Sequence, residues 1–118
     1  MFELMQKLVA FKYACKLNHW ETKSYAEHLL FDRLQEDVDD LIDDIAEKYF
    51  MATGKNAEKD LRNILQPTFI NMNLEESIQD IIRLTEKLCK EEKSESVIAL
   101  ISGIGETFMG KLALAGLK

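Results

Sequence analysis

A single proline, Pro67, interrupts the 118 residues, and this shortage of helix breakers is the strongest constraint on the fold. Proline costs a helix interior about 3 kcal/mol, so a chain with only one can keep long helices on both sides of it. Ala, Leu, Glu, Lys and Met are plentiful, which also favours helices over strands. At 47% hydrophobic, the chain is expected to form one domain, residues 1–118, around a small core.

Apolar residues recur at helical spacing in two long stretches of the N-terminal half. Residues 2 to about 19 predict a first helix, and residues 25 to about 52 predict a second, the longest and most periodic of the chain. Ser24 followed by Glu27 has the spacing of a capping box, which predicts the start of the second helix. Gly54 is placed to end it, because glycine readily adopts the left-handed conformation that closes helices.

The region from residue 54 to residue 73 breaks this periodicity. A short helix is expected within residues 55–65, because the proline that follows would stop it. Phe69 and Ile70 are expected to pack their apolar side chains against the longer helices.

The C-terminal half predicts two further helices. Asn73 with Glu76 forms a second capping box and predicts a third helix to about residue 92, and Ser94 predicts the start of a fourth, to about residue 115. Three glycines inside the last helix either allow a close helix contact or mark a kink: Gly103, Gly105 and Gly110. Short connections and one long one suit an all-α fold, a ferritin-like four-helix bundle with a long connection between helices 2 and 3.

The net charge of −6, from 21 acidic and 15 basic residues, disfavours plain electrostatic binding to nucleic acid and favours attraction of cations. Cys15 and Cys89 lie in apolar helical patterns without a close CxxC pair, which indicates reduced thiols. No stretch approaches the roughly 20 apolar residues of a membrane span, and the first residues do not have the composition of a signal peptide. A cytoplasmic location, without a membrane, is therefore expected.

The second helix carries its imidazole and several carboxylates on one narrow stripe. On a wheel of about 100° per residue with His28 at zero, Asp39 falls near 20°, Asp32 near 40°, Asp43 near 60° and Glu47 near 100°. The apolar stripe of the same helix is centred roughly 150° away from them. These side chains are therefore expected to point away from the core.

Imidazole nitrogen and carboxylate oxygen together suit Fe(II), Mn(II) or Zn(II). Bundle proteins with internal di-iron sites use Glu-x-x-His pairs on facing helices, and this chain contains none. A metal would thus be held on an outer face and completed by another subunit. The pattern also fits a solvated acidic surface with a surface histidine, His28, and a packing and capping pair formed by His19 and Trp20.

Residues 17–50, LNHWETKSYAEHLLFDRLQEDVDDLIDDIAEKYF, resemble the signature of the Dps family, the mini-ferritins. In that family a His-Trp ends the first helix, a His opens the second, an Asp follows four residues later, and Asp-x-x-x-Glu comes eleven residues after that. The same order occurs here as His19, Trp20, His28, Asp32, Asp43 and Glu47. A weaker similarity to the closing helix of the family covers residues 97–101 and 111–115.

The resemblance implies a ferroxidase that oxidises Fe(II), commonly with hydrogen peroxide, and stores the ferric product in a hollow shell of twelve subunits. It implies that one subunit contributes His19, His28 and Asp32 to the metal site, and that a two-fold partner contributes Asp43 and Glu47. Trp20 would lie near this site, where it packs in the interface or quenches radicals. Asp39 matches no ligand of the family.

Two features depart from the family. The spacing between His19 and His28 is shorter than usual, which leaves open whether His19 reaches the metal. The lysine-rich N-terminal arm of the DNA-binding members is missing, and Lys118 does not replace it, so DNA binding is not expected. The assembly is expected to be a homo-oligomer, at least a two-fold dimer, with the shell of twelve or a smaller form left open.

Three functions therefore compete. The leading hypothesis is a ferroxidase that uses Fe, with Zn or Mn as alternative occupants, and that stores iron and removes peroxide. The second is a structural dimer bridged by a fixed metal without redox turnover. The third is a metal-free helical interaction module whose site has decayed.

Overall fold

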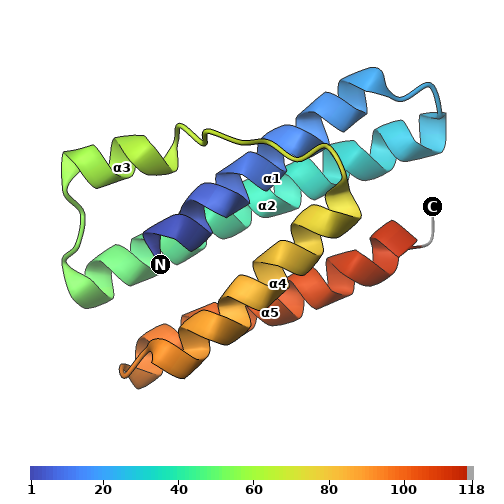
Figure 1. Ribbon diagram of the computed structural model, residues 1–118. Helices are drawn as coiled ribbons and strands as arrows, with labels where there is room; N and C mark the ends of the chain where they lie inside the picture. The colour runs from blue at the N-terminus through green and yellow to red at the C-terminus, as the bar shows by residue number, and fades with distance from the viewer. Residues whose placement is uncertain (117–118) are drawn as a thin grey trace.

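Five helices and no strand make up residues 1–116, the part of the chain that the computed structural model describes, with side chains described through Lys111. The all-α prediction is confirmed. The helices are α1 (Phe2–Glu21), α2 (Tyr25–Thr53), α3 (Glu58–Ile64), α4 (Leu74–Glu91) and α5 (Glu95–Gly116) (Figure 1). The side chains of residues 112–115, part of the weaker similarity to the Dps family, lie outside the described residues. Lys118 also lies outside them.

The predicted caps set the bounds of α2 and α4. The Ser24 hydroxyl accepts a hydrogen bond from the Glu27 backbone N–H at 3.3 Å, and Gly54 closes α2 with φ 70°. The Asn73 side chain accepts from the Glu76 N–H at 3.1 Å. Only this half of each capping box forms as predicted. The Glu27 carboxylate accepts a bond from the Thr22 hydroxyl at 2.9 Å instead of one from the Ser24 N–H.

The four long helices form two antiparallel hairpins, α1 with α2 and α4 with α5 (Figure 1). The segment between α2 and α4 contains the expected short helix, α3, and returns along the length of the molecule, so that α2 and α4 run in the same direction. The hairpins pack through α1 against α4 and through α2 against α5. Within residues 1–116, no helix is both long enough and apolar enough to cross a membrane.

The core extends through both hairpins, and Phe11 of α1 meets Phe108 of α5 inside it. Both rings are fully buried, and they pack edge to face with centroids 5.2 Å apart. Helix α1 is buried on more than one face, because α2, α3 and α4 all pack against it. Its buried residues therefore lie on more than one side of the helix, among them Leu4, Phe11, Ala14 and Cys15.

The long connection is held by side-chain amides that bind its backbone carbonyls. The Gln6 amide donates to the Asn63 carbonyl at 2.8 Å, and the Asn18 amide donates to the Met72 carbonyl at 3.0 Å. These bonds hold the connection in place without burying all of its apolar side chains. Ile70 packs on the core as expected, whereas the prediction for Phe69 is wrong, since its side chain is 73% exposed.

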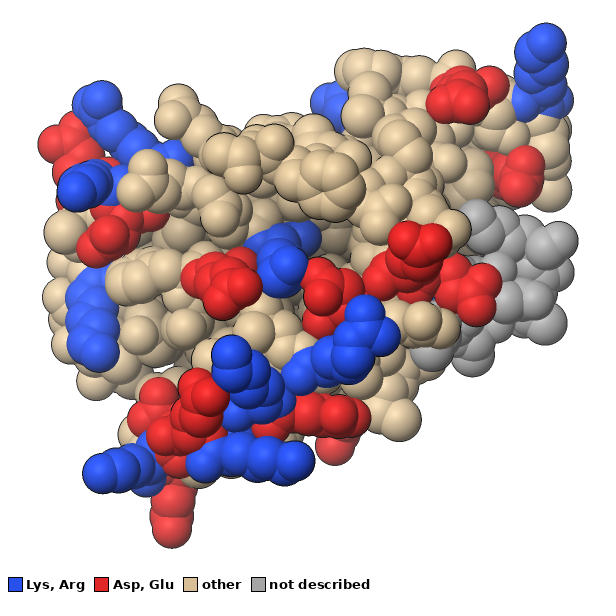
Figure 2. Space-filling model, viewed as in Figure 1, with Lys and Arg blue, Asp and Glu red and all other residues tan. Residues whose placement is uncertain are grey.

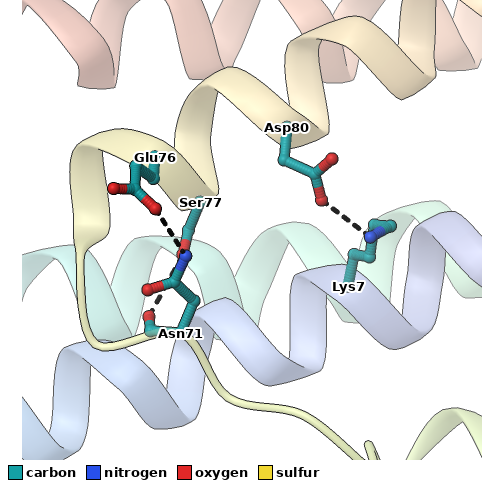
Figure 3. A network of polar contacts seen from close by, with 5 residues as sticks. All are labelled: Lys7, Asn71, Glu76, Ser77 and Asp80. Atoms are coloured by element: carbon teal, nitrogen blue, oxygen red, sulfur yellow. Dashed lines mark hydrogen bonds and ion pairs between the residues drawn. The ribbon is translucent and has the colours of Figure 1, made fainter.

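Polar contacts also tie this connection and α1 to α4 (Figure 3). The Ser77 hydroxyl donates to the Asn71 carbonyl at 3.1 Å, and the Asn71 amide donates to the Glu76 carboxylate at 3.3 Å. Lys7 of α1 forms an ion pair with Asp80 of α4 at 2.7 Å. Because both partners of this ion pair are partly exposed, it contributes at most about 1 kcal/mol.

Gly105 allows a close contact between α4 and α5. A Cβ at this position would lie 2.9 Å from the Thr85 hydroxyl oxygen, whereas a Cβ at Gly103 or Gly110 would meet open space. The Thr85 hydroxyl donates to the Ile82 carbonyl at 2.6 Å, so it is not free to move away. Helix α5 continues through all three glycines, which favours the close-contact interpretation over a kink.

We expect opposite effects from alanine at two of these glycines. Gly105→Ala forces Thr85 off its hydrogen bond and should lower the free energy of unfolding by about 1–3 kcal/mol. Gly103→Ala adds a methyl group in open space and should raise it by about 0.5–1 kcal/mol through helix propensity. Urea denaturation followed by circular dichroism measures both. Equal stability of the two variants would contradict the close contact.

Candidate functional site

The predicted ligands on α2 share its outward face. His28, Asp32, Asp43 and Glu47 are all exposed, as the helical wheel predicts. The opposite side of α2 is buried in the core through Phe31, Leu34, Val38, Ile45 and Tyr49. We refer to the exposed side, with these four residues, as the outer α2 face.

Some acidic residues of α2 form ion pairs with lysines, and others do not. Asp39 pairs with Lys12 of α1 at 2.7 Å, so its carboxylate already has a cationic partner. Two further acids are also paired: Asp44 with Lys48 at 2.9 Å, and Asp37 with Lys111 at 3.7 Å. By contrast, Asp32, Asp43 and Glu47 form no ion pair with any side chain described in the structure. All three predicted carboxylate ligands are therefore available to a cation.

The two histidines lie against each other at the turn between α1 and α2. Their rings stack with centroids 3.8 Å apart and an interplanar angle of 25°. Nδ1 of His19 lies 2.8 Å from the His28 carbonyl oxygen, and Nδ1 of His28 lies 3.2 Å from the His19 carbonyl oxygen. Each ring is thus held in place by the backbone of the other residue.

These two contacts also determine the tautomer of the neutral rings. A carbonyl oxygen only accepts hydrogen bonds, so each Nδ1 must carry the proton and donate it. The lone pair then resides on Nε2 of both His19 and His28. An imidazole held through Nδ1–H to a carbonyl, with Nε2 free, is the arrangement typical of histidines that bind metals.

The short connection at residues 22–24 brings His19 to this position. The chain leaves α1 after Glu21 and enters α2 at Tyr25, so the last turn of one helix directly faces the first turn of the next. The spacing of nine residues between the histidines therefore produces a close pair and does not separate them. The sequence pattern does not predict this stacking, because helical periodicity carries no information about the geometry of a turn.

One copy of the chain does not bring all five predicted residues together. His19 and His28 meet at one end of α2, and Asp32 follows one helical turn later. Asp43 lies about 22 Å farther along the helix axis than His28, at 1.5 Å per residue. Within the described residues, no group of three or more His, Cys, Asp or Glu side chains is arranged to hold a metal ion.

Exposed apolar side chains lie at both ends of the outer α2 face, a feature that sequence analysis missed. Tyr25 and Leu29 are 76% and 51% exposed near the histidines, and Met51 is 88% exposed near Glu47. On the same helical wheel, these residues fall at about 60°, 100° and 140°, within or beside the carboxylate stripe. Their wheel positions could have identified them, but only the structure shows that no described part of the chain covers them.

A shallow hollow of about 460 Å³ lies at the C-terminal end of this face. It is mainly apolar, and its lining consists of Glu47, Phe50, Met51 and Asn56. We call it the Glu47 hollow, since a predicted metal ligand forms part of its wall.

A second hollow, of about 430 Å³, lies between α1, the long connection and α4. The Lys7–Asp80 ion pair and the Asn71–Glu76 hydrogen bond lie in its walls, so these groups already have partners (Figure 3). Acidic and basic side chains are intermingled over α4 on the face shown in Figure 2. This surface therefore has the mixed charge of an ordinary solvated helix and is a weaker candidate than the outer α2 face.

Residues 19–112 match the model of a family described as a family of unknown function, DUF5856. The chain belongs to the DUF5856 family. The matched segment begins at His19 and includes all five predicted ligands, so the DUF5856 model extends over the histidine pair and the outer α2 face. Searches of curated proteins and of solved structures found no match. Because the function of the DUF5856 family is unknown, the match assigns no activity to the chain.

Proposed function

We propose that the protein is a Dps-like ferroxidase whose metal site forms between two copies of the chain. The observation that carries this proposal is the stacked pair of His19 and His28, with both Nε2 atoms free, on a face with unpaired carboxylates. Imidazole nitrogen and carboxylate oxygen are donors suited to Fe(II), and Zn(II) or Mn(II) can use the same set.

The spacing of the predicted ligands along α2 is consistent with a two-fold axis that relates two copies of the chain. The midpoint between His28 and Glu47 is also the midpoint between Asp32 and Asp43, and it falls between residues 37 and 38. Two antiparallel α2 helices that cross at this point would place His28 of one copy beside Glu47 of the other. The same crossing would place Asp32 beside Asp43, and it would form two equivalent sites.

Charge makes this pairing dependent on a cation. Carboxylates that face each other across the axis repel, and a divalent cation between them converts the repulsion into attraction. Asp43 and Glu47 would be the principal ligands of Fe(II). His19 and His28 would complete the coordination as neutral imidazoles, while Asp32 would bind iron or orient a histidine.

Such a donor set favours oxidation of the bound iron. Anionic oxygen ligands stabilise Fe(III) more than Fe(II), so each Fe(II) loses an electron more readily to hydrogen peroxide or oxygen. The two hairpins and their long connection are compatible with a ferritin-like bundle, in which a shell of subunits would store the ferric product. Cys15 and Cys89 form no disulfide with each other, which suits a reducing cytoplasm. Trp20, 66% exposed beside the histidines, would pack in the interface.

Native mass spectrometry with anaerobic Fe(II), followed by peroxide, tests this proposal. We expect Fe(II) to convert the monomer into a dimer or a larger even assembly with up to two iron sites per pair of chains. Added peroxide should then oxidise the iron faster than in buffer alone. Chelator-sensitive dimers without oxidation would favour the structural metal bridge, and chains that bind neither Fe(II) nor Zn(II) would favour the metal-free module.

A further inference from the structure

The Glu47 hollow combines an apolar floor with one carboxylate and one amide. Phe50 and Met51 supply apolar surface, and Glu47 and Asn56 supply hydrogen-bonding groups at its edge. An aromatic side chain with a polar end matches this lining, because the ring would cover Phe50 and Met51 while the polar atom reaches the carboxylate. Tyrosine is the side chain that carries both features together with a hydroxyl donor.

Tyr25 has the position that such an occupant requires. The crossing that pairs residue 28 with residue 47 also pairs residue 25 with residue 50, at the floor of the Glu47 hollow. Tyr25 is largely exposed in the first turn of α2, and no described side chain of its own copy covers it. The same register sets the exposed Leu29 against Ala46, so apolar surface meets apolar surface at both ends of the face.

We infer that the Glu47 hollow receives Tyr25 from a second copy of this chain, and that the Tyr25 hydroxyl donates a hydrogen bond to the Glu47 carboxylate. This inference rests on the two-fold arrangement proposed above and specifies what each copy contributes to the other. A hydroxyl–carboxylate hydrogen bond is short and strong. Tyr25 is therefore a positioning residue, which would hold Glu47 in the orientation that binds iron.

With a cation between the facing carboxylates, the two ends of the outer α2 face complement each other, which favours a second copy over an unrelated partner. Each end has exposed apolar side chains, and an imidazole at one end faces a carboxylate at the other when the helices run antiparallel. The two contacts at each end would be repeated by symmetry, which doubles the buried apolar area. An unrelated partner would have to reproduce this arrangement.

Cross-linking between copies tests the position of Tyr25. Tyr25→Cys and Met51→Cys, combined in one chain with Cys89→Ser, place two thiols about 39 Å apart along the same α2, too far for a short bismaleimide to join. With Zn(II) present, we expect the reagent to link most chains into covalent dimers. Tyr25→Cys with Met109→Cys is the control, because Met109 is also exposed but lies on α5. Equal dimer yields from the two variants would overturn the inference.

The role of the hydroxyl is tested with Tyr25→Phe, which keeps the ring. We expect this variant to dimerise as the parent does at saturating Zn(II), while its Fe(II) affinity falls by about 10-fold, the lower end of the range for lost partners of metal ligands. An unchanged affinity would overturn the positioning role.

Because Zn(II) is redox-inert, cross-linking with Zn(II) but without iron oxidation would refute the ferroxidase alone. Iron oxidation with cross-links no stronger than the control would refute the Tyr25 contact alone.

Discussion

Replacing both Asp43 and Glu47 with alanine should reduce peroxide-dependent Fe(II) oxidation to the rate in buffer, a loss of more than about 100-fold. Loss of an outer partner of a metal ligand already costs 10–100-fold, so loss of two ligands should cost more. Both side chains are exposed and neither forms an ion pair within the described residues, so the variant should fold as the parent does. Stopped-flow absorbance of the ferric product gives the rate.

The matched control removes two acids elsewhere. Glu86→Ala with Glu106→Ala changes the net charge by the same amount, on α4 and α5, at two exposed positions. This control should keep the oxidation rate of the parent. If both double variants lose activity alike, general attraction of cations explains the rate and the ligand assignment fails. If the Asp43 and Glu47 variant oxidises iron as fast as the parent, the assignment is wrong outright.

Phe108→Ala should cause the largest loss of stability, about 3–5 kcal/mol. The Phe108 ring of α5 is fully buried and meets the Phe11 ring of α1 edge to face, in the core between the two hairpins. Removing it leaves a cavity between the hairpins, which surrounding side chains can fill only in part. The melting temperature should fall by about 10–20 °C.

Thermal denaturation in the presence of a chelator measures this effect without a contribution from metal-linked dimers. Met109→Ala is the control at the next position, since Met109 is exposed and its loss leaves no cavity. It should change the free energy of unfolding by less than about 0.5 kcal/mol. A Phe108→Ala variant as stable as the Met109→Ala variant would contradict the assignment of Phe108 to the centre of the core.

Helical periodicity and capping residues were sufficient to predict most of the secondary structure. Ser24, Gly54 and Asn73 act locally, within one turn of the chain, so their effects follow from the sequence without tertiary contacts. Phe69 was expected to pack against the longer helices because it is apolar, but the amides of Asn18 and Gln6 hold the connection along a path that leaves this ring exposed. A path set by contacts between distant residues is not encoded in local periodicity.

The candidate site shows the same division. The sequence by itself determined that His28, Asp32, Asp43 and Glu47 lie on one outward face, because the helix repeat places residues three, four and seven apart on the same side. Only the tertiary structure decided which acids are available, since Lys12 comes from α1 to neutralise Asp39. It also decided that the short turn stacks His19 on His28 with both Nε2 atoms free, because that contact depends on how two helices meet.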